Sequence, residues 1–229
     1  MKSKKDGVAG TRNRRGVRIH ALSAIDIALH DLAGKQLGVP VHRLMGGART
    51  DRLAPYATIF VEHRAQASVS EYVDAVAAKA ERALALGFRA LKVEMLLGSV
   101  AADAQIVDTI RSIRRTIGHS VVLMVDFGYR WRDWHEAQWV LTRIVDCDIY
   151  FAEATLQHDL HGHARLSAVS PIRICGGEWA TTRWEVQEWI TSERWPSCNP
   201  TRAASTRRCR SAPRHFRLLP HRPRRRRRI

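Results

Sequence analysis

The chain has 229 residues, of which 45% are hydrophobic, and a net charge of +16, so it can form one large domain or two small ones around a substantial core. No apolar run approaches the roughly 20 residues that a membrane-spanning helix needs, and the basic N-terminus lacks the apolar segment of a signal peptide. These features argue against a membrane protein, and we expect a cytoplasmic location. The four cysteines show no CxxC pair and no metal-ligand spacing, so we expect reduced thiols.

The first part of the chain predicts two helices and one strand. Residues 1–18 are polar, basic and glycine-containing, and we expect them to form a disordered lead-in. Apolar residues at i, i+3, i+4 spacing form one stripe and predict a helix over residues 19–37. Residues 53–60 are a predicted strand, and Ser68-x-x-Glu71 is a capping box that opens the second helix.

From residue 88 onward, strands and helices alternate without a gap. The predicted strands cover residues 88–96, 121–126, 149–153 and 172–178, and the helices that follow them lie at about 101–117, 133–144, 160–168 and 182–190. The last of these helices begins with a second capping box, Thr182-x-x-Glu185. Together with the first strand and helix, this β/α pattern predicts a parallel sheet. We therefore interpret residues 19–193 as an α/β domain, a partial (β/α) TIM-type barrel of about five βα units.

The basic charge is concentrated at the C-terminal end. Residues 195–229 contain twelve arginines and neither lysine nor acid, so they carry +12 and residues 1–194 carry +4. We predict a disordered basic tail over residues 194–229, and its composition favours a GC-rich gene translated out of frame. The alternative is a tail that binds nucleic-acid phosphates. That alternative is weakened because Phe216 is the one aromatic residue after Trp195 that could stack on a base.

Three of the predicted strands end in a carboxylate. Asp126, Glu153 and Glu178 are separated by 27 and 25 residues, close to the roughly 31 residues of one unit in an eight-unit barrel. Parallel strands place their carboxyl ends on one face, where three acids would repel unless a cation lay among them. Oxygen-only ligands favour Mg²⁺. The alternative is three unrelated surface acids at the starts of loops.

Several of these segments resemble a known family. The stretch AIDIALHDLAGKQLGVPV from residue 24, followed by LMGG, resembles the start of the barrel of the enolase superfamily. It is most similar to the mandelate racemase / muconate lactonizing group, which includes many acid-sugar dehydratases. GFRALK, ending at Lys92, resembles that group's second strand, and the ends at Asp126, Glu153 and Glu178 resemble its metal-ligand strand ends. The resemblance covers about residues 16–193.

The resemblance implies a chemistry. Asp126, Glu153 and Glu178 would bind Mg²⁺, and the metal would hold the carboxylate of a small acid sugar. A base would remove the proton next to that carboxylate, giving an enediolate that the metal stabilises, and in dehydratases a β-hydroxyl then leaves. Racemase or cycloisomerase chemistry in the same scaffold is the alternative. The resemblance also implies that full-length relatives are homo-oligomers.

Two departures from the family pattern lie among the candidate site residues. The second strand of the family often reads Lys-x-Lys, and this chain has Lys92-Val93-Glu94. Residues two apart on a strand share a face, so we take Lys92 and Glu94 as catalytic candidates, with a structural Lys92–Glu94 pair as the alternative. Tyr129 and Arg130 follow the Asp126 strand and are candidates for substrate binding, the alternative being ordinary exposed loop residues.

The resemblance also points to missing parts. The family's capping domain would precede residue 16, and its sixth to eighth strands would follow residue 193. We therefore expect a truncated copy with weak stability, two open sheet edges and little or no turnover. His215 and His221 lie in the predicted tail and are not assigned a role.

Overall fold

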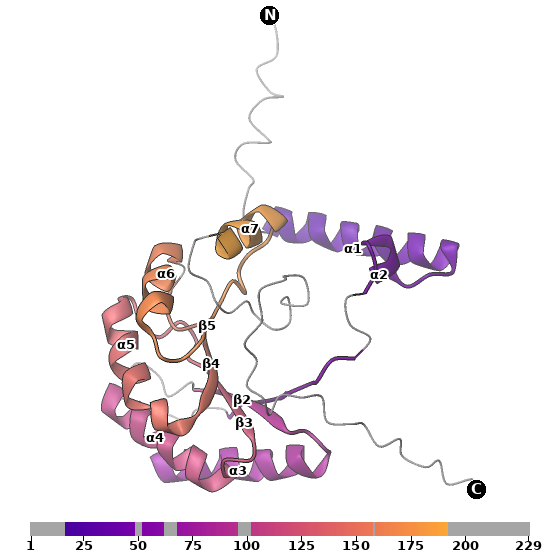
Figure 1. The fold of residues 1–229 in the computed structure, drawn as a ribbon. Coiled ribbons are helices and arrows are strands. Elements are labelled where there is room, and N and C mark those ends of the chain that lie inside the picture. The colour runs from indigo at the N-terminus through magenta and orange to yellow at the C-terminus, as the bar shows by residue number, and fades with distance from the viewer. Residues whose placement is uncertain (1–16, 49–51, 62–67, 96–101, 158, 192–229) are drawn as a thin grey trace, which may run out of the picture.

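The computed structural model describes residues 17–48, 52–61, 68–95, 102–157 and 159–191 (Figure 1). The predicted tail over residues 194–229 lies outside the described residues, as does the predicted lead-in up to residue 16. The predicted lead-in is too long at its C-terminal end, because helix α1 already begins at Val17.

Five parallel strands form one sheet in which each strand pairs with the next one along the chain. The strands are β1 (Ala57–Ile59), β2 (Ala90–Glu94), β3 (Val122–Asp126), β4 (Ile149–Glu153) and β5 (Ile174–Cys175). The helices that follow them are α3 (Val69–Ala85), α4 (Asp103–Ile117), α5 (Trp134–Arg143), α6 (Leu160–Val169) and α7 (Arg183–Thr191), with a short 3-10 helix η1 (Val145–Cys147) before β4. Figure 1 shows α3 to α6 along one side of the curved sheet, as consecutive units build the wall of a barrel. The predicted α/β partial barrel is confirmed.

The strand side chains divide between two faces because neighbouring residues point to opposite sides. One face packs against the helices and forms the main core, where Leu91, Leu123, Val125 and Ile174 are almost fully buried. The other, which we call the inner face, carries a small apolar cluster of Ala90, Met124, Phe151 and Cys175. Lys92 follows Ala90, and Glu94 follows Lys92, at two-residue steps. Both charged side chains therefore belong to the inner face.

The predicted capping boxes fix the starts of two helices. The Ser68 hydroxyl accepts from the Glu71 amide at 3.2 Å, and the Glu71 carboxylate accepts from the Ser68 amide at 2.7 Å. The same reciprocal pair joins Thr182 and Glu185 at the start of α7. These bonds satisfy amides that have no partner within the helix. Both predicted boxes are confirmed.

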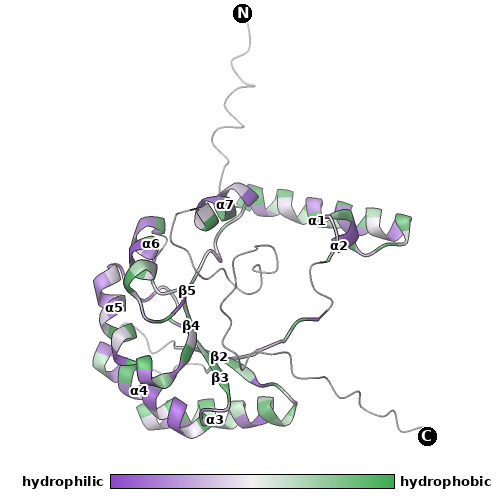
Figure 2. Ribbon diagram, in the orientation of Figure 1, coloured by the Kyte–Doolittle hydropathy of each residue, from purple (hydrophilic) through white to green (hydrophobic). Residues whose placement is uncertain are grey.

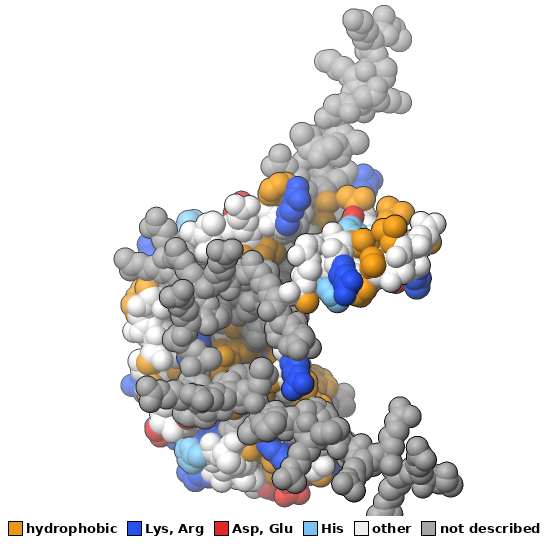
Figure 3. Space-filling view, turned by 45° about the vertical axis from the view of Figure 1, so that its right-hand side comes forward, with side chains coloured by type: hydrophobic (Ala, Val, Ile, Leu, Met, Phe, Trp, Pro, Cys, Tyr) orange, Lys and Arg blue, Asp and Glu red, His pale blue; other side chains and the backbone are white. Residues whose placement is uncertain are grey.

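Helices α1 (Val17–Leu37) and α2 (Val41–Leu44) form an arm to one side of the sheet (Figure 1). The short helix α2 was not predicted. Figure 2 shows apolar residues recurring along α1, and Figure 3 shows hydrophobic side chains at the surface of the arm. The predicted stripe of α1 is exposed, with Leu22, Ile25, Leu29 and Leu32 between 52% and 61% accessible. Helical spacing identifies an apolar stripe but not the surface that covers it.

No helix in the described ranges is both long and apolar enough to span a membrane.

Arg114 of α4 is a buried cation at the amino ends of the strands. Its side chain donates to four backbone carbonyl oxygens, those of Cys147 at 2.7 Å, Gly118 and Val121 at 2.8 Å each, and Asp148 at 3.1 Å. Only 3% of the residue is exposed. The guanidinium thereby ties the loop before β3 to the loop before β4.

Candidate active site

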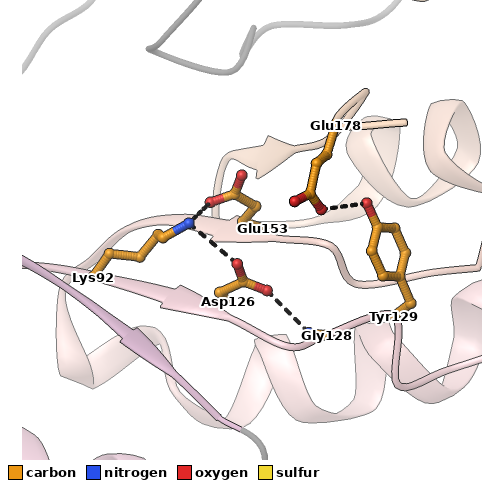
Figure 4. A network of polar contacts seen from close by, with 6 residues as sticks. All are labelled: Lys92, Asp126, Gly128, Tyr129, Glu153 and Glu178. Atoms are coloured by element: carbon orange, nitrogen blue, oxygen red, sulfur yellow. Dashed lines mark hydrogen bonds and ion pairs between the residues drawn. The ribbon is translucent and has the colours of Figure 1, made fainter. Parts of the chain in front are cut away.

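The carboxyl ends of the strands bring a row of acids together. The pairing register places Glu94 beside Asp126 and Asp126 beside Glu153. Paired residues of parallel strands point to the same face, so these three side chains share the inner face. The predicted strand over 172–178 is shorter in the structure, because β5 ends at Cys175 and Gly177 adopts a positive φ of 86°. Glu178 therefore lies on the loop after β5, and Figure 4 shows its side chain turned toward the other acids.

Lys92 bridges two of the acids. Its Nζ lies 2.7 Å from Oε2 of Glu153 and 3.2 Å from Oδ2 of Asp126 (Figure 4). The Lys92 side chain is 12% exposed, and those of Glu153 and Asp126 are 7% and 16% exposed. Two acids that share one ammonium are not unrelated surface acids. Among the described residues, the ion pairs of Lys92 go to Asp126 and Glu153 and none goes to Glu94, so the alternative of a structural Lys92–Glu94 pair is wrong.

The pKa values of the site reflect its excess of negative charge. Burial alone would lower the pKa of Lys92, but its hydrogen bond to Glu153 and the charges of Glu153 and Asp126 outweigh burial and raise it. Burial raises the pKa of Glu153, against the effect of Lys92 and with help from Asp126 and Glu178. Burial and then the charge of Asp126 raise the pKa of Glu94, again partly offset by Lys92. The ammonium of Lys92 is thus held in its charged form, while burial and the neighbouring acids disfavour the charged forms of Glu94 and Glu153.

Tyr129 donates its hydroxyl to Glu178. The hydroxyl oxygen lies 2.8 Å from Oε2 of Glu178 (Figure 4), and burial followed by this bond raises the pKa of Tyr129, so that it keeps its proton. The Tyr129 backbone is left-handed with φ of 61°, and its amide donates to the carbonyl of Ala154, which has φ of 48°. Left-handed residues other than glycine cost roughly 1–3 kcal/mol each and gather at functional sites.

Arg130 forms an ion pair with Asp103, which is not one of the acids at the strand ends. Its Nε lies 3.1 Å from Oδ1 of Asp103, the first residue of α4, and the indole of Trp131 donates to the same carboxylate. The substrate-binding role predicted for Arg130 is not tested by this contact and stays a prediction.

Two tyrosines that the sequence did not single out support the site. The ring of Tyr56, just before β1, lies 5.9 Å from the Lys92 ammonium, and the hydroxyl of Tyr72 donates to the backbone carbonyl of Glu94 at 2.6 Å. Neither residue belongs to a recognisable motif. Their proximity depends on how β1 and α3 pack beside β2.

The donor set fits a hard divalent cation. Glu94, Asp126, Glu153 and Glu178 offer only oxygen atoms, and oxygen ligands suit Mg²⁺. Within the ranges that the structure describes, no three acid, histidine or cysteine side chains lie close enough to hold a metal ion. Instead, Lys92 contacts two of the predicted ligands and Tyr129 contacts the third.

Two family models match the chain. The family model described as "Enolase C-terminal domain-like" matches residues 75–205. The N-terminal domain model of "Mandelate racemase / muconate lactonizing enzyme" matches residues 4–46, which include much of the predicted lead-in and the helix α1.

Three relatives illustrate the likeness. An arabinonate dehydratase of Saccharolobus solfataricus is 31% identical over 76% of this chain and 44% of the relative. A D-galactarolactone cycloisomerase of Agrobacterium fabrum is 33% identical over 73% of this chain and 42% of the relative. The crystal structure of a racemase from Streptomyces coelicolor A3(2) with bound magnesium superposes with a TM-score of 0.68 at 27% identity, over 82% of this chain and 50% of that one. The chain thus spans about half or less of the length of these relatives.

Proposed function

The chain belongs to the mandelate racemase / muconate lactonizing enzyme group of the enolase superfamily, and from that premise we propose that it carries the site of a Mg²⁺-dependent lyase that dehydrates an acid sugar. Its relatives include acid-sugar dehydratases and cycloisomerases. The observation that carries the proposal is that Asp126 and Glu153 hold the ammonium of Lys92 between them.

Asp126, Glu153 and Glu178 would hold the metal. Asp126 and Glu153 sit at paired register positions, and Glu178 faces them from the loop after β5 (Figure 4). Mg²⁺, when bound, would neutralise the substrate carboxylate as the neighbouring proton becomes acidic. Tyr129 orients Glu178 through its hydroxyl, the kind of supporting contact that keeps a ligand in place.

Glu94 is the base that the arrangement favours. It pairs with Asp126 of the neighbouring strand on the inner face. Its pKa is raised above that of an ordinary carboxyl group, in the direction of the pH at which a general base works best. As a carboxylate it takes the proton next to the substrate carboxylate, and as an acid it returns a proton to the departing hydroxyl, so that water leaves. Lys92 supplies positive charge to the substrate carboxylate on the same face.

Cycloisomerisation is the second candidate, because the cycloisomerase relative is as similar to this chain as the dehydratase is. Both reactions begin with the same proton abstraction. They differ in the leaving group: a dehydratase releases a hydroxyl as water, whereas a cycloisomerase opens or closes a ring and its product keeps the composition of the substrate.

The test is proton exchange followed by product analysis. The chain is incubated in D₂O with Mg²⁺ and a panel of aldonates and aldarates, and deuterium next to the carboxylate is measured by NMR. Exchange is the sensitive measurement, because it reports proton abstraction even where no product accumulates. We expect Glu94→Gln to lower the exchange rate by roughly 10²–10⁴-fold, with Glu81→Gln on the exposed side of α3 as the matched control. A product that has lost one water supports dehydration, and a product with the composition of its substrate supports cycloisomerisation. The absence of both exchange and divalent-metal binding overturns the proposal.

A further inference from the structure

We propose that Lys92 competes with the metal for the same carboxylate oxygens. The Lys92 ammonium must leave Asp126 and Glu153 before a divalent cation binds them. The proposal rests on the proposed function, because it concerns the same carboxylates. It adds a role for Lys92 that precedes chemistry: this side chain sets how tightly the metal is held.

The competition follows from the contacts of Asp126. Its Oδ2 lies 3.2 Å from the Lys92 ammonium, and its Oδ1 accepts from the amide of Gly128 at 3.0 Å. Both oxygens of this carboxylate are therefore occupied by donors, as Figure 4 shows. The Gly128 amide belongs to the backbone and cannot withdraw without moving the loop. The ammonium of Lys92 stands on a flexible four-carbon stem and can withdraw by rotating its side chain.

The Lys92 ammonium and a divalent cation cannot lie between Asp126 and Glu153 at the same time. Mg²⁺ binds carboxylate oxygens at about 2.0–2.1 Å. The Lys92 ammonium already lies 2.7 Å from Oε2 of Glu153 and is largely buried with its two partners. A divalent cation on the same oxygen atoms would meet a positive charge at short range in a poorly solvated site. One cation must replace the other.

Once released, the Lys92 ammonium can approach the carboxylate of Glu94 on the inner face. Glu94 lies two residues along the same strand and on the same face, so its carboxylate is within the sweep of the Lys92 side chain. Binding of the metal therefore moves the charge of Lys92 from the ligand carboxylates toward the place proposed for substrate. Metal loading and recognition of an anionic substrate become coupled through this one side chain.

The experiment measures metal affinity without turnover. Mn²⁺ is titrated into the full chain, and the free ion is followed by electron paramagnetic resonance for the wild type, Lys92→Met and Lys92→Gln. Lys79→Met is the matched control, because Lys79 lies on α3 and donates to the backbone carbonyl of Phe60 instead of to a carboxylate of the site. We expect Mn²⁺ to bind both Lys92 variants roughly tenfold more tightly or better, and the control as it binds the wild type.

Thermal unfolding gives a second readout. Without metal, both Lys92 variants should melt below the wild type, because two buried carboxylates lose their cation. With saturating Mn²⁺ they should recover, and their rise in melting temperature should exceed that of the wild type. If either variant is unfolded without metal, refolding with Mn²⁺ supports the proposal, and failure to refold contradicts it.

The remaining outcomes separate this inference from the proposed function. Equal or weaker Mn²⁺ binding by the Lys92 variants, with normal binding by the wild type, overturns the competition alone. Undetectable binding by every variant overturns the proposed metal site and the competition with it. Binding that survives the double substitution Asp126→Asn and Glu153→Gln places the metal elsewhere and overturns both.

Discussion

Lys92 and Arg114 are two buried cations at opposite ends of the same sheet, and they are neutralised in different ways. Arg114 sits at the amino ends of the strands and donates to four backbone carbonyls. Lys92 sits at the carboxyl ends and pairs with two carboxylates. Backbone carbonyls are fixed by the fold and carry no full charge, whereas carboxylates can exchange one cation for another. Arg114 therefore belongs to the scaffold, whereas the partners of Lys92 have the chemistry that the proposed metal site requires.

The largest expected effect on stability comes from replacing Arg114. Arg114→Met leaves four carbonyls without their donor, and we expect a loss of roughly 3–5 kcal/mol in the free energy of unfolding, as for other buried charge networks. Denaturant unfolding measures it, and Arg115→Met on the exposed side of the same helix should change stability by less than about 0.5 kcal/mol. Mn²⁺ should raise the melting temperature of Lys92→Met by more than that of the wild type, and that of Arg114→Met by about as much as that of the wild type. A rise in Arg114→Met that also exceeds the wild-type rise contradicts the contrast.

The amino end should also show its own pH dependence through Cys147. Burial raises the pKa of this thiol from its ordinary 9.0 to about 11. The folded protein thus keeps the proton that the unfolded chain releases, so stability is complete below about pH 9 and falls as pH rises toward 11. The difference amounts to at most about 2–3 kcal/mol, at about 1.36 kcal/mol for each pKa unit.

Comparing the wild type with Cys147→Ala isolates that contribution. Unfolding curves at pH 8 and pH 11 should show a smaller decline for the variant than for the wild type. Equal declines mean that the thiol ionises without a penalty and that this end of the sheet is more open than the structure indicates.

At the carboxyl end, the supporting contact of Tyr129 should affect metal binding and leave the scaffold nearly unchanged. Tyr129→Phe removes the hydroxyl that orients Glu178, and we expect about tenfold weaker Mn²⁺ binding. Tyr150→Phe, the same substitution on β4, is the control. Unchanged affinity in Tyr129→Phe assigns the hydroxyl to substrate, as the sequence predicted, instead of to Glu178.

The smallest expected change in stability comes from a helix cap that contacts neither Lys92 nor Arg114. Ser68→Ala removes the cap of α3 and should cost about 1 kcal/mol. Ser70→Ala, in the first turn of the same helix, should be neutral or slightly stabilising. If Ser68→Ala also altered Mn²⁺ affinity, the two ends of the sheet would not be independent of the surrounding helices.

Local chemistry made part of this structure predictable. Ser68 and Glu71 lie three residues apart, so the capping box could be identified without knowledge of the fold. The five βα units followed from apolar periods, and the family resemblance followed from short motifs around Lys92, Asp126 and Glu153. The same rules located α1 but did not indicate that its apolar stripe is exposed, and they failed for the end of β5, which stops before Glu178 because Gly176 and Gly177 interrupt the strand.

The sequence by itself determined the strands, their order and the acids at their ends, because these depend on neighbouring residues and on the right-handed rule for parallel crossovers. Only the tertiary structure decided which charges meet. Lys92 is 34 residues from Asp126 and 61 from Glu153, yet it pairs with both and not with Glu94. Register across the strands sets that choice, together with the desolvation that makes a buried carboxylate seek the nearest ammonium. Neither can be read from the spacing of residues along one strand.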